Sequence, residues 1–166
     1  SVHLTFNALI PIHNMLKNKI ALVTGAGSGI GEAVAQLFSA NGASVVLADM
    51  DNAGSERVLA LIEKQGGQGL VVKTDVSQPA ECERLVSDTV KKFGRLDIAV
   101  NNAGIGGPSA LTGDYPIDGW DKVIAINLSG VFYGMRYQIP AMLKNGGGSI
   151  VNMASILGKV GFPMSS

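Results

Sequence analysis

A glycine-rich segment near the start of the sequence has the spacing of a phosphate-binding turn. It follows the apolar run 20–23 and reads Thr24-Gly25-Ala26-Gly27-Ser28-Gly29-Ile30-Gly31. Such a turn lets a pyrophosphate approach the backbone N–H groups at a helix N-terminus, where bulky side chains would exclude it. The spacing is TGxxxGxG, with Thr24, Gly25, Gly29 and Gly31, and GxGxxG does not fit. The segment predicts a dinucleotide site, and a tight strand-to-helix connection is the alternative.

An acidic residue stands where a ribose-binding group is expected. Asp49 ends the second apolar run, 44–48, eighteen residues after Gly31. An acid about 20 residues beyond such a turn accepts hydrogen bonds from the adenosine ribose of NAD. The acid would repel the 2'-phosphate of NADP, and Ser28 provides no cation in the glycine turn to bind it. We therefore expect NAD, with a solvated acid next to Asp51 as the alternative.

A third polar segment follows the fourth apolar run, 96–100. It reads Asn101-Asn102-Ala103-Gly104. Ligands of open α/β sheets bind at the carboxyl ends of the strands, near the switch in strand order. Asn102, Ala103 and Gly104 are therefore expected at the same edge as the glycine turn, and an ordinary Asn/Gly turn is the alternative.

Apolar runs alternate with helix-period stretches along the whole chain. Strands are expected at 20–23, 44–48, 69–73, 96–100 and 149–154, and helices at 32–40, 53–65, 79–93 and 118–144, the last bent near Pro140. Apolar strands that alternate with helices indicate a parallel sheet covered on both faces. The fold class expected is α/β, a Rossmann-type doubly wound sheet. Because the complete fold of this type has the order 3-2-1-4-5-6, we expect its C-terminal part to be missing here.

The combined motifs resemble the short-chain dehydrogenase/reductase family, from about Lys17 to Ser166. The resemblance implies that Asp75 and Val76 flank the adenine ring. It also implies that Asn127 is the catalytic asparagine, which holds a helix irregularity and a water in a proton relay. The alternative for Asn127 is a helix–helix hydrogen bond. The full cofactor site that we expect consists of Thr24, Gly25, Ser28, Gly29, Ile30, Gly31, Asp49, Asp75, Val76, Asn102, Ala103 and Gly104.

Ser155 ends the fifth apolar run and matches the family's catalytic serine, which hydrogen-bonds the substrate oxygen. The alternative is a strand-end cap. The family's proton donor is a tyrosine in a YxxxK pattern, and no such pattern follows Ser155. Tyr133 and Tyr137 lie on the long helix and lack a lysine four residues on. We therefore expect the 166 residues to be part of a longer polypeptide, whose fifth strand would otherwise be an unpartnered apolar edge.

Composition excludes several other classes of protein. Lys+Arg and Asp+Glu are 13 each, which argues against a nucleic-acid groove or an anionic-membrane surface. No apolar run reaches the ~18 residues of a membrane span. Cys82 is the one cysteine, interpreted as an ordinary helix residue. His3 and His13 are the only histidines, so we expect neither a disulfide nor a metal site.

The organisation expected is an N-terminal extension, 1–16, followed by one domain, 17–166. Met15 resembles a natural start, and residues 1–14 would then be an added extension. Because no targeting signal is found, a cytoplasmic location is expected. The family resemblance implies a homo-oligomer, either a dimer or a tetramer, that packs through the long helix. Gly130 and Gly134, four residues apart, indicate close approach of another element to that helix.

The function expected is NAD(H)-dependent interconversion of a secondary alcohol and a ketone, with a small molecule as substrate. The alternative is a truncated, non-catalytic dinucleotide-binding or interaction protein. A family member with epimerase or dehydratase chemistry is a weaker interpretation, because the spacing is TGxxxGxG and not TGxxGxxG.

Overall fold

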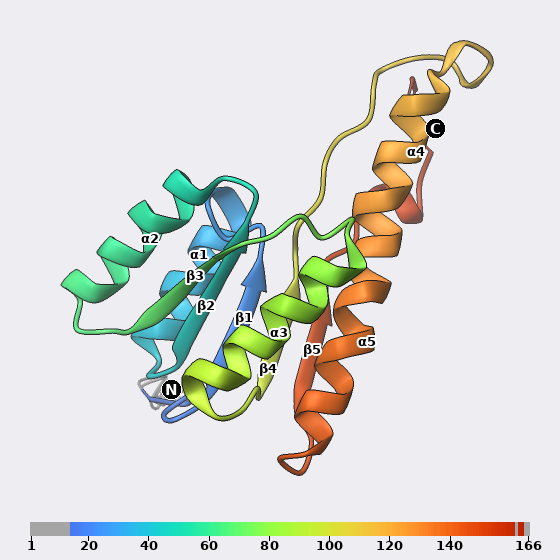
Figure 1. Ribbon diagram of the computed structural model, residues 1–166. Coiled ribbons are helices and arrows are strands. Elements are labelled where there is room, and N and C mark those ends of the chain that lie inside the picture. Colours follow the sequence, from blue (N-terminus) through green and yellow to red (C-terminus); the bar gives the residue numbers. More distant parts are fainter. Residues whose placement is uncertain (1–13, 162, 165–166) are drawn as a thin grey trace, which may run out of the picture.

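The computed structural model describes residues 14–161 and 163–164, so His3 and His13 lie outside the described residues. Five parallel strands form one sheet with the order β3-β2-β1-β4-β5, as predicted (Figure 1). The strands are β1 Ile20–Thr24, β2 Ser44–Asp49, β3 Gly69–Lys73, β4 Ile98–Asn101 and β5 Ser149–Asn152. The helices are α1 Gly29–Ala40, α2 Asn52–Lys64, α3 Pro79–Phe93, α4 Ile117–Ile124 and α5 Gly130–Leu143. Short 3-10 turns, η1 and η3, cover Thr112–Asp114 and Ile156–Gly158.

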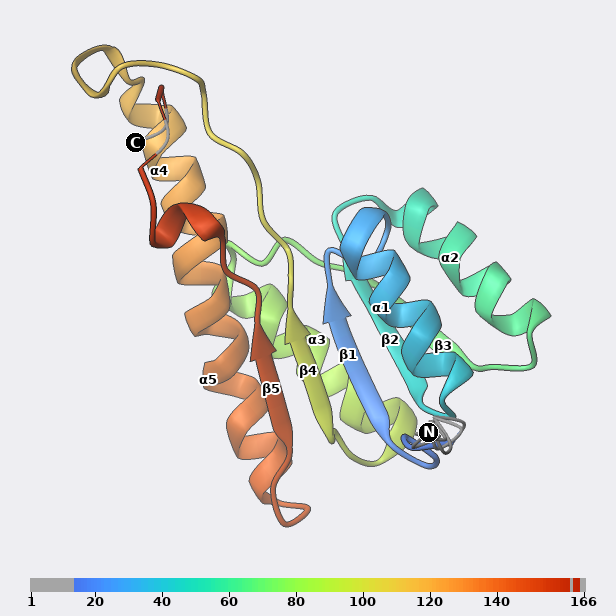
Figure 2. The same cartoon turned by 180° about the vertical axis from the view of Figure 1, so that it is seen from behind.

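Helices cover both faces of the sheet, which confirms the predicted fold class (Figure 2). Alternate residues of β1 point to opposite faces, as the two-residue period of a strand requires. Ala21 and Val23 belong to the core cluster that includes Ala35 of α1 and Val58 of α2. Leu22 belongs to the opposite cluster, which includes buried residues of α3 and α5. The sheet is therefore buried on both sides in its centre.

Several boundaries differ from those predicted. The helix α1 begins at Gly29, three residues before the predicted start, so its first turn lies inside the glycine cluster. The strand β4 begins at Ile98, and β5 ends at Asn152. Leu16, assigned by sequence to the N-terminal extension, packs against the core, and its N–H donates to the carbonyl oxygen of Asn41 at 2.9 Å.

The long helix is interrupted around Asn127, where the family resemblance implied an irregularity. Its α geometry changes to a five-residue π-helix, η2, over Ala125–Ser129, and α5 continues through Pro140. The predicted bend near Pro140 is therefore not the interruption, although the irregularity expected around Asn127 is confirmed. A π segment inside an α-helix is common at functional sites.

Two glycines of α5 allow the close approach that their spacing predicted. A Cβ on Gly130 would lie 2.9 Å from Cγ2 of Val76, and one on Gly134 would lie 2.9 Å from Oδ1 of Asn101. Larger residues at these positions would push the helix away from the sheet. The packing of α5 therefore fixes the segments that carry Val76 and Asn101.

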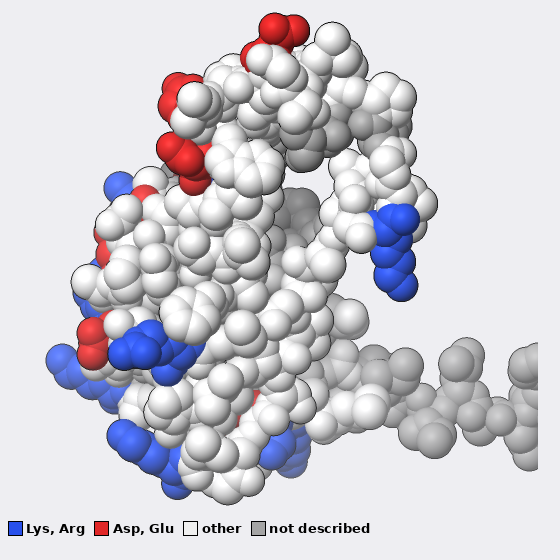
Figure 3. All heavy atoms as spheres, turned by 90° about the vertical axis from the view of Figure 1, so that its right-hand side faces the viewer, with Lys and Arg blue, Asp and Glu red and all other residues white. Residues whose placement is uncertain are grey.

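The strand β5 is an edge of the described sheet. It pairs with β4 through four residues, and Val151 remains 50% exposed. Figure 3 shows this side of the molecule as a mostly uncharged surface, with acidic and basic side chains at its margins. Across residues 14–161 and 163–164, every helix is too short or too polar to cross a bilayer.

Candidate functional site

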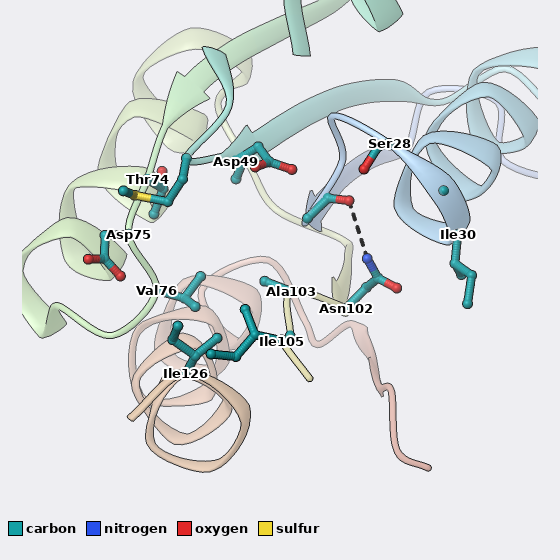
Figure 4. A pocket seen from close by; sticks show the side chains of 15 residues that line it. Ser28, Ile30, Asp49, Thr74, Asp75, Val76, Asn102, Ala103, Ile105 and Ile126 are labelled. Atoms are coloured by element: carbon teal, nitrogen blue, oxygen red, sulfur yellow. Dashed lines mark hydrogen bonds between the residues drawn. The ribbon is translucent and has the colours of Figure 1, made fainter. Parts of the chain in front are cut away.

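A cavity of about 420 Å³ lies at the carboxyl ends of the parallel strands (Figure 4). The switch in strand order at β1 and β4 opens a crevice there, because the following helices run to opposite faces of the sheet. Most of the cofactor-binding residues predicted from sequence line it, namely Gly25, Ser28, Gly29, Ile30, Asp49, Asp75, Val76, Asn102, Ala103 and Gly104. Segments from four strand ends therefore meet in one place.

Further lining residues were missed by the sequence analysis. They are Ala48, Met50, Thr74, Ile105 and Ile126. The first four are direct neighbours of predicted residues at strand ends, so their positions in the sequence could have indicated them. Ile126 comes from the π segment, and only its place beside Asn127 relates it to the site.

The glycine turn can accept a phosphate group because its glycines carry no side chains that would keep the phosphate from the backbone. A Cβ on Gly31 would overlap the carbonyl oxygen of Gly25. Gly29 has φ +55° and faces open space, so its backbone is accessible from the cavity. The first N–H groups of an α-helix have no partner within the helix, and Ser28 makes no capping hydrogen bond. These donors, at the positive end of α1, suit an anion.

Thr24 lies behind the cavity and joins the ends of β1 and β4. Its Oγ1 accepts hydrogen bonds from the backbone N–H groups of Asn102 and Ala103, each at 3.0 Å. The side chain of Asn102 donates back to the carbonyl oxygens of Thr24, at 3.0 Å, and Gly25, at 3.3 Å (Figure 4). Thr24 and Asn102 thus hold the glycine turn against the segment 102–104.

Backbone donors fix the carboxylate of Asp49 on the cavity wall. Its Oδ2 accepts from the N–H of Gly27 and its Oδ1 from the N–H of Asp51, both at 2.9 Å. A carboxylate offers about four acceptor positions, so two remain for a ligand. The geometry therefore suits the two adjacent hydroxyls of a ribose.

The segment after β3 is held by the start of α3. Oδ1 of Asp75 accepts from the N–H and Oγ of Ser77, and the Asp75 N–H donates to Oε2 of Glu81 at 2.8 Å. Val76 presents its side chain to the cavity in Figure 4. The neighbouring Cys82 is buried, and its Sγ donates to the carbonyl oxygen of Val76 at 3.4 Å. Burial, with the charges of Asp75 and Glu81, raises the pKa of the Cys82 thiol to about 11.

Neither of the two predicted catalytic residues is among the residues that line the cavity. Asn127 pairs with the loop after β4: its Oδ1 accepts from the N–H of Ile105 and its Nδ2 donates to the Ile105 carbonyl, both at 2.9 Å. It therefore joins the π segment to a loop and not to another helix. Ser155 follows β5 and caps η3, accepting at Oγ from the N–H of Leu157 at 3.2 Å.

The sequence is similar to known dehydrogenases. The family model described as short chain dehydrogenase matches residues 19–166. The cyclohexanol dehydrogenase of Acinetobacter sp. (strain SE19) is 44% identical over 148 residues, covering 89% of this chain and 59% of that protein. The 2,5-dichloro-2,5-cyclohexadiene-1,4-diol dehydrogenase LinX of Sphingobium indicum is 37% identical over 145 residues, covering 87% of this chain and 58% of that protein.

The fold is similar to solved structures with related names. An NAD+-bound xylitol dehydrogenase has a TM-score of 0.88 and 33% identity, covering 91% of this chain and 58% of that chain. A levodione reductase has a TM-score of 0.88 and 37% identity, covering 91% of this chain and 59% of that chain. The chain thus spans just under three fifths of the length of these four proteins.

Proposed function

The chain belongs to the short-chain dehydrogenase family, and on that basis we propose that it binds NAD(H) for the interconversion of a secondary alcohol and a ketone. The main support for NAD(H) over NADP(H) is the carboxylate of Asp49 on the cavity wall, which is held in place by the backbone N–H groups of Gly27 and Asp51. Two adjacent ribose hydroxyls can donate to its free positions, whereas a 2'-phosphate would meet a like charge.

The described residues divide the proposed cofactor site into three regions. The first turn of α1, at Ser28 to Gly31, would hold the pyrophosphate with backbone N–H groups. Asp49 would bind the adenosine ribose, and Val76 would contact the adenine ring, with Asp75 beside it. The segment 102–104 would support the nicotinamide half. A bound nicotinamide would supply the hydride acceptor or donor.

Residues of this chain would orient the substrate beside that site. Oγ of Ser155 accepts a hydrogen bond from Leu157, so its O–H remains able to donate to a substrate oxygen and stabilise developing charge. Both polar atoms of the Asn127 amide bind the backbone of Ile105, so Asn127 would hold Ile105 at the cavity wall. The names of these relatives refer to alcohols and a dione, which supports a small alcohol or ketone as substrate.

The cellular setting belongs to the same proposal. We expect a cytoplasmic protein that forms a dimer or tetramer, without a nucleic-acid or membrane partner. Equal numbers of acidic and basic residues support the absence of a polyanionic partner. Oligomeric state is read directly by light scattering of the purified protein.

Cofactor titration tests the proposal. NADH and NADPH are added separately to the purified chain, and the dissociation constants are obtained from nicotinamide fluorescence. We expect tighter binding of NADH, and we expect Asp49→Ala to remove most of that preference. Binding of neither cofactor, or tighter binding of NADPH, would overturn the proposal.

A second measurement separates oxidoreduction from the non-catalytic alternative. Because these 166 residues lack the YxxxK pattern that supplies the family's proton donor, the assay is made on the full-length protein. Secondary alcohols are added together with NAD, and absorbance of the reduced nicotinamide is followed. An increase supports the dehydrogenase, whereas binding without any increase across the substrates tested supports a dinucleotide-binding protein without turnover.

A further inference from the structure

An arginine outside the cavity is joined to the glycine turn. Arg57 lies on α2 and forms a two-pronged ion pair with Glu32 of α1, with Nη1 to Oε1 at 2.9 Å and Nη2 to Oε2 at 2.6 Å. The Nη2 group also donates to the carbonyl oxygen of Gly27 at 3.1 Å. Two adjacent helices and the glycine turn therefore meet at one guanidinium group. Its planar fork suits such a site better than a lysine would.

The same glycine contacts the ribose-binding acid. The N–H of Gly27 donates to Oδ2 of Asp49 at 2.9 Å, while its carbonyl accepts from Arg57. The surroundings are crowded: a Cβ on Gly27 would lie 3.1 Å from Oδ2 of Asp49, and one on Gly54 would lie 2.8 Å from the Gly27 carbonyl oxygen. Gly27 is thus held on both of its polar groups, and a continuous chain of hydrogen bonds leads from Glu32 to Asp49.

We propose that Arg57, held by Glu32, is a positioning residue that fixes the carboxylate of Asp49 through Gly27 and so sets the preference for NADH over NADPH. The inference rests on the proposed function of the cavity. Arg57 is not among the residues that line it, so it acts through Gly27. Orienting an acceptor before the ligand binds lowers the entropic cost of binding, and only a ligand that uses that acceptor benefits.

This role differs in its consequences from two simpler ones. If Arg57 acted only through its positive charge, its removal would weaken binding of NADPH more than of NADH, because NADPH carries the additional phosphate. If Arg57 only stabilised the fold, its removal would weaken both cofactors by the same factor. The positioning role alone predicts a loss confined to NADH.

The test compares Arg57→Met with Lys64→Met, which removes the same charge from an exposed position on the same helix. Dissociation constants for NADH and NADPH are measured for both variants and for the unaltered chain. We expect Arg57→Met to weaken NADH about tenfold, the effect of losing one charge-assisted hydrogen-bond system, and to change NADPH less than about twofold. Lys64→Met should leave the ratio of the two constants unchanged.

Two further variants examine the proposed chain of contacts. Arg57→Lys should recover part of the NADH affinity, since an ammonium group can reach either Glu32 or Gly27 but lacks the fork. In an Asp49→Ala background, Arg57→Met should have no further effect on the ratio, because the group that it positions is gone. Additive effects of the two substitutions would overturn the inference.

The outcomes distinguish the inference from the function on which it rests. If the unaltered chain fails to prefer NADH, the proposed function is wrong, and the inference is wrong with it. If the unaltered chain prefers NADH and Arg57→Met retains that preference, only the positioning role is wrong. An equal loss for both cofactors also overturns it, and then indicates a purely structural role.

Discussion

At the scale of single residues, two glycines of one turn have different reasons to lack a side chain. Gly31 has no space, since a Cβ there would overlap the carbonyl oxygen of Gly25. Gly29 has space, but its φ of +55° is strained for other residues. The spacing of the glycines in the motif does not distinguish these two reasons. The atoms around Gly31 and the backbone φ of Gly29 do distinguish them.

Alanine substitutions separate the two glycines. We expect Gly31→Ala to reduce the free energy of unfolding by about 3 kcal/mol, because backbone must move to relieve the overlap. Gly29→Ala should cost about 1 kcal/mol of strain. It also adds a methyl group to the cavity, so NADH affinity should fall although the fold is kept. Urea unfolding checks the first two values, and equal losses for the two variants would contradict this explanation.

The thiol of Cys82 should be protected in the folded chain. Its pKa is raised to about 11, whereas an exposed thiol titrates near pH 8.5. Between these values the unfolded chain releases the proton and the folded chain keeps it, so stability falls as pH rises through this window. A thiol reagent at pH 8 should react slowly with folded protein and rapidly in urea. Rapid reaction without urea would show that the start of α3 opens easily.

At the scale of elements, the site depends on a joint between the π segment and the loop after β4. Asn127 supplies it with two hydrogen bonds to the backbone of Ile105. Both Ile105 and Ile126 line the cavity, so the joint fixes one of its walls.

Removing the joint should release the loop. We expect Asn127→Ala to speed hydrogen exchange of the Ile105 amide and to cost about 1–2 kcal/mol of stability for two lost hydrogen bonds. Asn145→Ala is a suitable control, because the Asn145 side chain donates only to the Ala141 carbonyl at the end of the same helix. Unchanged exchange at Ile105 would show that other contacts hold the loop.

The sequence predicted those parts of the site that depend on strand ends. In a parallel sheet all carboxyl ends share an edge, so placing Gly25, Asp49 and Asn102 after three strands was enough to bring them together. The pair formed by Glu32 and Arg57 could not be predicted, since their contact depends on how α1 and α2 pack. The position of the π segment was available only from the family resemblance, because one extra residue in a turn leaves little trace in hydrophobic periodicity.

At the scale of the whole molecule, the strands of the sheet are unevenly buried. The strands β1 and β2 are buried over nearly their full length, whereas Val151 of β5 is 50% exposed and Met153 just after it is 41% exposed. An exposed apolar edge strand pairs readily with other chains. When the 166 residues are prepared alone, association should therefore begin on the side of the molecule that carries β5 (Figure 3).

A charge on this edge should reduce association. We expect Val151→Lys to raise the concentration at which the purified chain remains monomeric, as measured by light scattering. Leu37→Lys, which places the same charge at an exposed apolar position of α1, away from β5 and from the long helix, should have a smaller effect. Equal effects would mean that net charge, and not the edge, controls association.

The hydrogen bonds that Thr24 accepts affect the direction in which a ligand can lie in the cavity. By accepting from the N–H groups of Asn102 and Ala103, it uses up donors on the floor of the cavity. Hydrogen-bond donors then remain at the first turn of α1, acceptors at Asp49, and a hydrocarbon wall at Val76. An elongated ligand with an anionic middle and unlike ends would keep its middle at the first turn of α1 when reversed, but its ends would be mismatched at Asp49 and Val76. The arrangement of these groups therefore favours one of the two directions for such a ligand.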